Sequence, residues 1–515
     1  MLRSVLSLSV ALALTACSPQ NSSTEQQTQS AATEEAQQQL SSGVIKENMD
    51  LSVDPGDDFF RYVNGKWFDN FEIPADKSSY GSFVILRDEA QDHVMDIIKS
   101  SAEGDFKAGS DEQKVGDFYR AYMDMETRNE LGMTPLKPEL SKIDAIEDYT
   151  DLAEYFAYAA RYGYGTPFSL TQYPDLKSPK EYLMYTWQSG LGLPEREYYF
   201  KDDETSQTIR DAYVKHIQTM FELAGFDAPK ESADMLFALE TKIAQLHMKK
   251  EQARNFAANY NKLTIEELKA LMPKFDWDAY LTEADISDIP SLGILQKDYM
   301  QNIDGVIAET SLEDWKTFLK WGLLNASASR LNAELDEANF NFYSKVLRGV
   351  EEQQPQWRRA VSLSNAHVGE LIGKVYVKQH FPPEAKDRMM EMVNNLLLAY
   401  KESIENLDWM TDETRAQALD KLSKFTVKIG YPDQWRDYSA LTVNASDLFG
   451  NLKRSSDVLY EEMLKKQGGP VWTHEWGMTP QTVNAYYNPP LNEIVFPAAI
   501  LQPPFFDMNA DDAVN

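Results

Sequence analysis

Histidine is the side chain from which catalytic metal sites are most often built, so the six histidines are the first place to look for chemistry. A helical zinc site of the H-E-x-x-H type needs two imidazoles four residues apart, with a glutamate between them that activates the bound water. The most closely spaced pair, His367 and His380, is far wider than that. The sequence therefore contains no such motif, and it also lacks the G-x-S-x-G elbow of serine hydrolases.

A second kind of chemistry, the holding of an extended peptide, is indicated by NAYYNPPLNEIVFPAAILQPPFF at residues 484–506. Residues 483–487 are rich in β-branched and aromatic side chains and predict a strand, which Pro489 must end because proline cannot donate to a ladder. An exposed edge strand can bind a peptide through main-chain hydrogen bonds. Asn484 offers donors and an acceptor, and Ala485 is small enough to admit a second backbone. An ordinary edge strand beside a core hairpin is the alternative.

The charge balance disfavours one class of partner. The chain has 50 basic and 81 acidic residues, a net charge of -31, and no long basic run. A surface that binds nucleic acid needs clustered Lys and Arg, so we expect no nucleic-acid partner. Acidity of this kind is typical of a well-solvated surface.

The amino terminus, MLRSVLSLSVALALTAC, predicts export. Arg3 precedes an apolar run at residues 5–14, and a leucine and two small residues lead directly to Cys17, the only cysteine. This pattern resembles a bacterial lipoprotein signal, which implies cleavage before Cys17, its lipidation and a membrane anchor. Because Ser18 follows the cysteine, the resemblance points to the outer membrane, facing the periplasm. An ordinary secretory peptide is the alternative.

Composition divides the rest of the chain. Residues 18–43 are rich in Gln, Ser, Thr and Glu, and we expect a disordered tether. Residues 76–430 are dominated by a helical period and are predicted to be mostly helix, with loops at Pro167, Pro194 and Pro290. From residue 430 onward, glycine and proline interrupt that period.

The clearest helix prediction lies within residues 388–407. One apolar face recurs every three or four residues, at Met389, Val393, Leu396, Tyr400, Ile404 and Leu407. Thr411, followed by two acidic residues, predicts the cap of the next helix.

Several separate motifs, in one order, resemble those of the neprilysin family of zinc metalloendopeptidases, from about residue 44 to the end. The carboxy-terminal ones are Asn484-Ala485-Tyr486-Tyr487, Ile494-Val495-Phe496-Pro497-Ala498 and Leu501-Gln502-Pro503-Pro504-Phe505-Phe506. The earlier ones are Asp54-Pro55-Gly56-Asp57-Asp58-Phe59-Phe60, Asn64-Gly65-Lys66-Trp67, Tyr80-Gly81-Ser82-Phe83, Leu86-Arg87-Asp88, Gly192-Leu193-Pro194 with Tyr198-Tyr199, and Trp409-Met410.

The resemblance implies a mainly α fold: the large helical lobe of a two-lobed, neprilysin-like peptidase, plus the first strands of an incomplete thermolysin-like α+β catalytic lobe. The expected organisation is a signal peptide at 1–17, a tether at 18–43, the helical lobe at 44–430 and the start of the catalytic lobe at 431–515. The two lobes would enclose a chamber that admits oligopeptides.

The resemblance also implies roles for two residues. The Asn484 side chain would bond the main chain of the substrate, and the Ala485 carbonyl would accept a peptide N–H. In the family, a zinc-bound water then attacks the peptide carbonyl. Gly56 stands where animal relatives have a cysteine, and Ser79 stands where neprilysin has an arginine that grips a free carboxylate, so a preference for terminal peptide bonds is not implied.

The zinc motif of the family should follow directly after Asn515. We therefore expect the sequence to be the amino-terminal part of a longer enzyme, with no zinc bound to this chain and no peptidase activity of its own. A peptide-binding lipoprotein that does not cleave is the alternative, although a lone hairpin is marginal in water. A solute-binding α/β protein lacks support, because strands and helices do not alternate.

Overall fold

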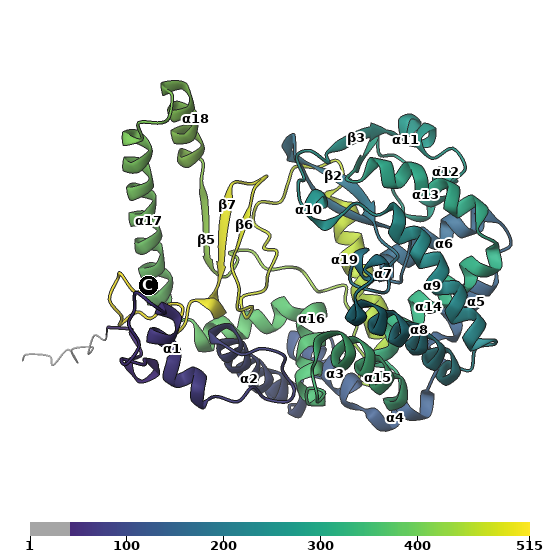
Figure 1. Cartoon of the computed structure of the whole chain (residues 1–515), viewed down its shortest axis with the longest axis horizontal. Coiled ribbons are helices and arrows are strands. Elements are labelled where there is room, and N and C mark those ends of the chain that lie inside the picture. Colours follow the sequence, from purple (N-terminus) through teal and green to yellow (C-terminus); the bar gives the residue numbers. More distant parts are fainter. Residues whose placement is uncertain (1–41) are drawn as a thin grey trace, which may run out of the picture.

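A computed structural model describes residues 42–515; the predicted signal peptide, Cys17 and most of the predicted tether lie outside the described residues. Helices dominate, and the mainly α fold expected from the sequence is confirmed (Figure 1). Within residues 42–515 no helix combines the length and apolar content needed to cross a bilayer.

The longer helices are α1 (Phe59–Asn70), α2 (Ser82–Glu103), α3 (Asp111–Met123), α5 (Lys137–Asp144), α6 (Tyr149–Tyr162), α8 (Glu204–Ala224), α9 (Pro229–Leu246), α13 (Lys297–Glu309), α14 (Leu312–Ser327), α15 (Ala333–Phe340), α16 (Gln356–His380), α17 (Pro383–Asn406), α18 (Asp412–Ser423) and α19 (Leu448–Lys466). The short ones are α4 (Met125–Leu131), α7 (Glu197–Phe200), α10 (Lys250–Ala253), α11 (Ile265–Leu271), α12 (Trp277–Glu283) and the 3-10 turn η3 (Ala328–Arg330).

The larger hydrophobic core, which we call the first core, gathers buried side chains between residues 136 and 342. It forms because helices such as α6, α9 and α14 each present an apolar stripe to the same interior. Trp315 is wholly buried near Phe156, whose ring it meets edge-on at 5.4 Å. Its indole nitrogen donates to the Ile307 carbonyl at 3.0 Å, so this large side chain is buried without an unsatisfied donor.

A four-stranded sheet runs along the first core in the order β1-β2-β4-β3. Its strands are β1 (Phe168–Asp175), β2 (Ser178–Gln188), β3 (Asn261–Thr264) and β4 (Ser291–Ile294). The prediction that residues 76–430 are mostly helix missed this sheet. β3 and β4 have four residues each and are too short for a period to show. The aromatic and β-branched run at residues 182–187 is the signal that could have revealed β2.

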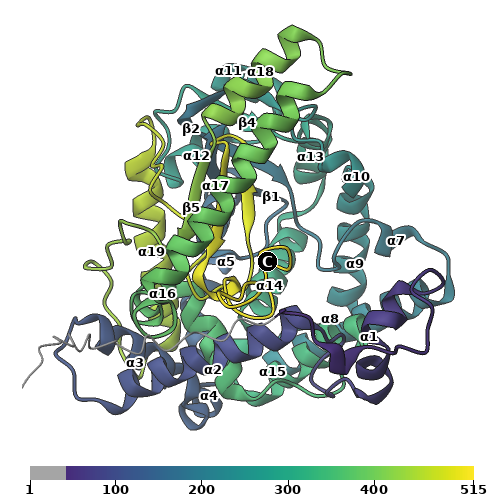
Figure 2. The same ribbon diagram turned by 90° about the vertical axis from the view of Figure 1, so that its left-hand side faces the viewer.

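The second core joins α2, α3 and α16 to the carboxy-terminal residues. Ile98 of α2, Ile372 of α16 and Ala499 are completely buried in it. Three strands rise from this base: β5 (Thr426–Gly430), β6 (Tyr486–Asn488) and β7 (Glu493–Pro497). Figure 1 shows them on the opposite side of the molecule from most helices of the first core, and Figure 2 shows α2 running beneath them.

Helix α17 has the predicted period, but only its first half is covered. Met389 and Val393 are buried, whereas Leu396 and Tyr400 are 51% and 63% exposed. Figure 1 shows α17 and α18 projecting together beyond the second core. Thr411 caps α18 as predicted, because its hydroxyl accepts the Thr414 N–H at 3.2 Å.

Helix α19 packs on the first core, although its neighbours in sequence belong to the second. Phe449, Met463 and Leu464 contact the first core. The chain therefore crosses from the β5 side to the first core through residues 431–447, and it returns through residues 467–485 (Figure 1).

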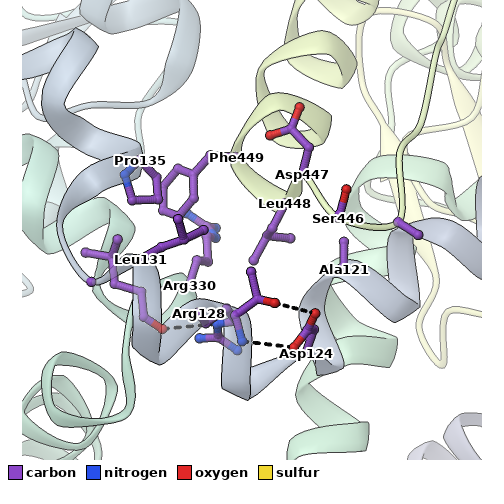
Figure 3. Close-up of a pocket in the computed structure, with 14 residues that line it drawn as sticks. Ala121, Asp124, Arg128, Leu131, Pro135, Arg330, Ser446, Asp447, Leu448 and Phe449 are labelled. Atoms are coloured by element: carbon purple, nitrogen blue, oxygen red, sulfur yellow. Dashed lines mark hydrogen bonds between the residues drawn. The ribbon is translucent and has the colours of Figure 1, made fainter.

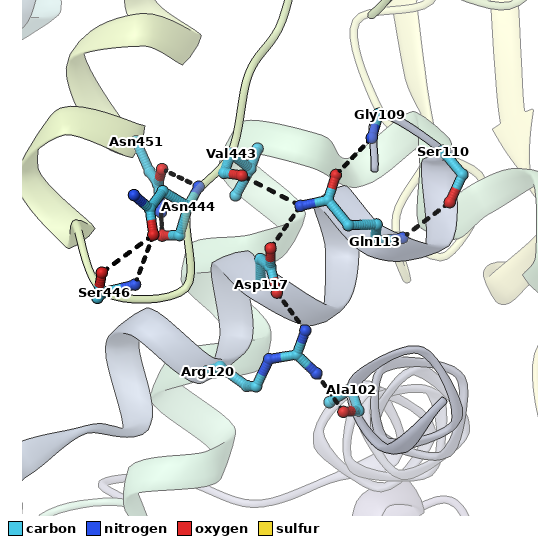
Figure 4. A network of polar contacts seen from close by, with 10 residues as sticks. All are labelled: Ala102, Gly109, Ser110, Gln113, Asp117, Arg120, Val443, Asn444, Ser446 and Asn451. Atoms are coloured by element: carbon cyan, nitrogen blue, oxygen red, sulfur yellow. Dashed lines mark hydrogen bonds and ion pairs between the residues drawn. The ribbon is translucent and has the colours of Figure 1, made fainter. Parts of the chain in front are cut away.

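The first of these crossings is tied to α3. The Gln113 side-chain nitrogen donates to the Val443 carbonyl at 3.1 Å and also to Asp117 (Figure 4). Asn444 and Asn451 then exchange two hydrogen bonds, at 2.8 and 2.7 Å, that fix the turn into α19. Hydrogen bonds therefore attach this crossing to α3 through Val443 and to α19 through Asn444.

Candidate functional site

The carboxy-terminal sheet has the order β5-β7-β6, so β6 forms one of its edges. β7 is parallel to β5 and antiparallel to β6. The edge strand predicted at residues 483–487 is observed at Tyr486–Asn488, a shift toward the carboxy terminus. The strand begins late because the Thr482 carbonyl accepts the Asn484 N–H at 3.0 Å in a turn, and it ends before Pro489 as predicted.

A buried ion pair fixes the three strands. Lys428 of β5 and Glu493 of β7 lie 2.8 Å apart, and both side chains are almost wholly buried. Asn488 of β6 donates to the same carboxylate at 3.3 Å, and the Lys428 ammonium also donates to the Glu475 carbonyl at 2.9 Å. A buried pair is stable when further hydrogen bonds satisfy its charges, so these contacts hold β6 in register.

The segment that leads into β6 is anchored to α16. Gln481 is buried, and its side-chain nitrogen donates to the Gly369 carbonyl at 2.8 Å and to Asn365 at 2.9 Å. The segment also packs closely on α16 at Gly369. A Cβ at this position would lie 2.8 Å from the Thr479 methyl group, so the close packing favours glycine. Helix α16 therefore sets the position of the residues just before the edge strand.

Asn484 and Ala485 lie side by side immediately before β6. The Asn484 side chain is exposed, and its oxygen accepts the Ala485 N–H at 2.9 Å. The amide oxygen thus accepts one hydrogen bond, and the amide nitrogen, which can donate two, donates none to the described residues. The sequence-predicted pair is thus together at the edge of the sheet, as two consecutive residues with different polar groups.

A cavity of about 740 Å³ opens beside Asn484. It lies between α2, α16, the first crossing and residues 476–484. Its walls carry charged and amide groups, including Arg87, Gln91 and Glu370. A space of this size, next to an edge strand, can take side chains of an extended peptide.

Two tyrosines complete the surroundings of β6: Tyr486, which belongs to one of the family motifs, and Tyr173, which the sequence analysis did not mention. The Tyr486 hydroxyl accepts the Gly477 N–H at 2.7 Å, and burial raises the pKa of Tyr486 to about 12, so the group stays protonated at neutral pH. Tyr173 of β1 donates to the Asn488 side chain at 2.9 Å. The edge strand of the first-core sheet therefore reaches the edge strand of the carboxy-terminal sheet. No spacing in the sequence predicts such a contact, because 315 residues separate its partners.

The zinc ion that the resemblance implies does not fit the described residues. Within residues 42–515, no group of three or more His, Cys, Asp or Glu side chains lies close enough to hold a metal ion. His216 is buried, and His247 and His367 are partly buried: desolvation lowers the pKa of His216 to about 3, and of His247 and His367 to about 4. These imidazoles are neutral packing groups.

Two sequence-family models match the chain. The amino-terminal model of "Peptidase family M13" matches residues 55–432, and a second model with the same description matches residues 484–515. Curated relatives include endothelin-converting enzyme-like 1 of Mus musculus, which is 28% identical over 493 residues, and neprilysin-3 of Drosophila melanogaster, which is 28% identical over 506 residues. Each match covers 92% of this chain, which spans 63% and 64% of those relatives.

The chain is also similar to solved structures. The zinc metalloprotease 1 of Mycobacterium tuberculosis, in complex with an inhibitor, is 40% identical and superposes with a TM-score of 0.88, covering 92% of this chain and 72% of that one. The same protease in its open state gives a TM-score of 0.77. PepO from a Lactobacillus species, at 21% identity and a TM-score of 0.79 over 88% of this chain and 72% of that one, shares the fold.

Proposed function

Because the chain belongs to peptidase family M13, as the neprilysin resemblance predicted, we propose that it forms the helical wall and the peptide-binding edge of a zinc-dependent metalloendopeptidase that hydrolyses oligopeptides. The observation that carries the proposal is the position of Asn484 and Ala485 at the free edge of a three-stranded sheet, beside a cavity of about 740 Å³. The TM-score is higher for the inhibitor complex than for the open protease, so the described residues are arranged more like the inhibitor-bound form of that relative.

In this proposal an extended peptide adds to the sheet alongside β6. The Asn484 amide nitrogen donates to a peptide carbonyl, while its oxygen stays engaged by Ala485. The Ala485 carbonyl accepts a peptide N–H, and the small side chain lets the two backbones approach. Main-chain contacts of this kind supply affinity for many sequences, and the cavity selects among side chains.

Residues 42–515 provide no cluster of metal ligands, so we propose that this chain binds peptides without hydrolysing them. Zinc would supply the activated water for hydrolysis, and the ligands for it must come from outside the described residues. Incubation of the purified 515-residue chain with an unstructured peptide and zinc should leave the peptide intact by mass spectrometry. Stoichiometric zinc binding with peptide turnover would refute this.

Peptide binding is tested with a fluorescent, unstructured oligopeptide. An uncharged hydrogen bond contributes about 1 kcal/mol, so Asn484→Ala should weaken binding about fivefold in fluorescence anisotropy. The matched control is Asn302→Ala, which removes an exposed asparagine of α13 far from β6 and should leave the affinity unchanged. Equal affinities for the wild type and both variants would remove the support for the edge strand as the binding site.

We also propose that the chain is exported and anchored in the outer membrane through lipidated Cys17, with its folded part in the periplasm. The support is the amino-terminal sequence alone. Fractionation of cells that express the whole gene should find the wild type in the membrane fraction and Cys17→Ser in the soluble fraction or uncleaved. A membrane location that survives Cys17→Ser would contradict the anchor.

A further inference from the structure

Arg330, the last residue of η3, carries a charge that no described residue neutralises. One guanidinium nitrogen donates to the Ala326 carbonyl at 2.6 Å. The Nε atom is wholly buried and has no hydrogen-bond partner, and no ion pair of residues 42–515 includes Arg330. Figure 3 shows the side chain beside Phe449, where it borders one of two small cavities. A largely buried guanidinium without an acidic partner is costly, so this group favours a bound anion.

The second cavity next to Arg330 has a volume of about 90 Å³ and is lined by both polar and apolar residues. Tyr164 and Ser327, the last residue of α14, are among the polar ones. Lys453 of α19 forms part of the opposite wall. The space is large enough for a single small ion with a water molecule, and too small for an organic phosphate.

Among the cations that line this cavity, Arg330 is the one without an acidic partner in the described residues. Lys453 donates to Glu139 at 2.7 Å, and Glu139 also lies 3.6 Å from Lys142. His367 is also neutral at physiological pH, because burial and then the nearby Arg330 lower its pKa to about 4. Asp457, on the far side of Tyr162, is paired with Arg161 at 3.0 Å. The Arg330 guanidinium is therefore the uncompensated charge.

We propose that this cavity binds a small inorganic anion, chloride in the first instance, between the Arg330 guanidinium and Tyr164. The anion would neutralise a guanidinium that has no acidic partner among the described residues. It would also link η3 and the end of α6 to α19, the helix that lies between the two crossings. This site shares no lining residue with the cavity beside Asn484, so the anion proposal does not depend on the proposed function.

The test is thermal unfolding of the 515-residue chain at constant ionic strength, with chloride replaced by gluconate, which is too large for the cavity. A ligand at a hundredfold excess over its dissociation constant should raise the midpoint by about 3 °C in a protein of this size. Arg330→Met should abolish the difference between the two salts, and Tyr164→Phe should reduce it. Formate, an anion of the same charge with three non-hydrogen atoms, distinguishes a chloride site from a general carboxylate site.

Arg254→Met is the matched control, since Arg254 is exposed and takes part in no ion pair among residues 42–515. It should keep the full chloride effect, which separates specific binding from a general salt effect. If Arg330→Met does not fold, crystals of the wild type grown in bromide decide the matter, with an anomalous peak expected beside Arg330. A water molecule alone in that position, or a chloride effect that persists in Arg330→Met, would overturn the proposal.

Discussion

Both hydrophobic cores are built from amphipathic helices, but they differ in how completely the apolar faces of these helices are covered. In the first core, α9 buries Leu236, Leu239 and Ile243 almost completely. In the second, α17 carries the same kind of apolar stripe, yet Leu396 and Tyr400 are 51% and 63% exposed. An amphipathic period thus predicts that a helix forms, but whether its apolar face is covered depends on elements elsewhere in the chain.

Both sheets are open, with edge strands β1 and β3 in the first and β5 and β6 in the second. The inner strand β4 is buried along its whole length, whereas the edge strand β6 follows Asn484, which lines the cavity of about 740 Å³. A protein normally protects such an edge, so a free one beside a cavity is the part of this fold most suited to holding a ligand.

The largest expected effect lies in the first core. Trp315→Ala removes a wholly buried indole and should lower the free energy of unfolding by about 4 kcal/mol in urea denaturation. Hydrogen exchange should accelerate in α9, which shares this core, and stay near its original rate in β7, which belongs to the other part. Equal acceleration in both would mean that the two cores unfold as one unit.

The next effect tests the carboxy-terminal sheet. Lys428→Met leaves Glu493 buried without its cation and should destabilise the chain by roughly 3 kcal/mol in the same assay. The double variant Lys428→Met with Glu493→Leu should recover most of that loss, because no buried charge remains. A double variant as unstable as the single one would show that packing, and not charge, sets the stability of this sheet.

A third prediction uses pH to probe the first core. Burial raises the pKa of Glu240 to about 7, against hydrogen bonds from Tyr199 and Tyr213 that lower it. A carboxyl whose pKa is higher in the folded state favours folding at low pH, and it loses this contribution as the pH rises from 5 to 7.5, by about 2 kcal/mol. Glu240→Gln should abolish this contribution to the pH dependence of the free energy of unfolding.

The buried histidines act in the opposite direction, since the lowered pKa of His216, His247 and His367 costs stability as the pH falls below about 6.5. The Glu240 effect is therefore read as the difference between the wild type and Glu240→Gln at each pH. Parallel stability curves for the two proteins would show that Glu240 does not change its protonation in this range.

The smallest effect is expected on α17. Leu398→Ser alters a side chain that is 65% exposed and should change the free energy of unfolding by less than about 0.5 kcal/mol. Leu239→Ser, at a position only 4% exposed on α9, is the matched control and should cost several times more. Comparable losses would show that α17 is covered in solution.

Local patterns predicted much of the fold. The period around Met389 and the cap at Thr411 gave two helices correctly, and the proline after Asn488 gave the end of the edge strand. The first-core sheet was missed because β3 and β4 are too short to show a period, and the exposure of Leu396 was missed because a period contains no information about neighbours.

The same distinction between local patterns and tertiary contacts applies to the candidate site. The family motifs led to Asn484 and Ala485, whose placement at the sheet edge depends on residues that no motif marks. Gln481 holds them to α16, and Tyr173 reaches across from the other sheet. The roles of Asn484 and Ala485 in binding remain predictions that the anisotropy experiment tests. Contacts between distant segments are fixed by tertiary packing, which local sequence reports only weakly.

The placement of α19 has a consequence for synthesis on the ribosome. The first core needs Phe449, Met463 and Leu464, which are translated more than a hundred residues after the last helix of that core, α15. A nascent chain that has reached α16 therefore exposes the apolar surface that α19 later covers. Folding of the amino-terminal part cannot be completed in order of synthesis, and a chaperone that shields this surface until residue 466 emerges would raise the yield of native protein.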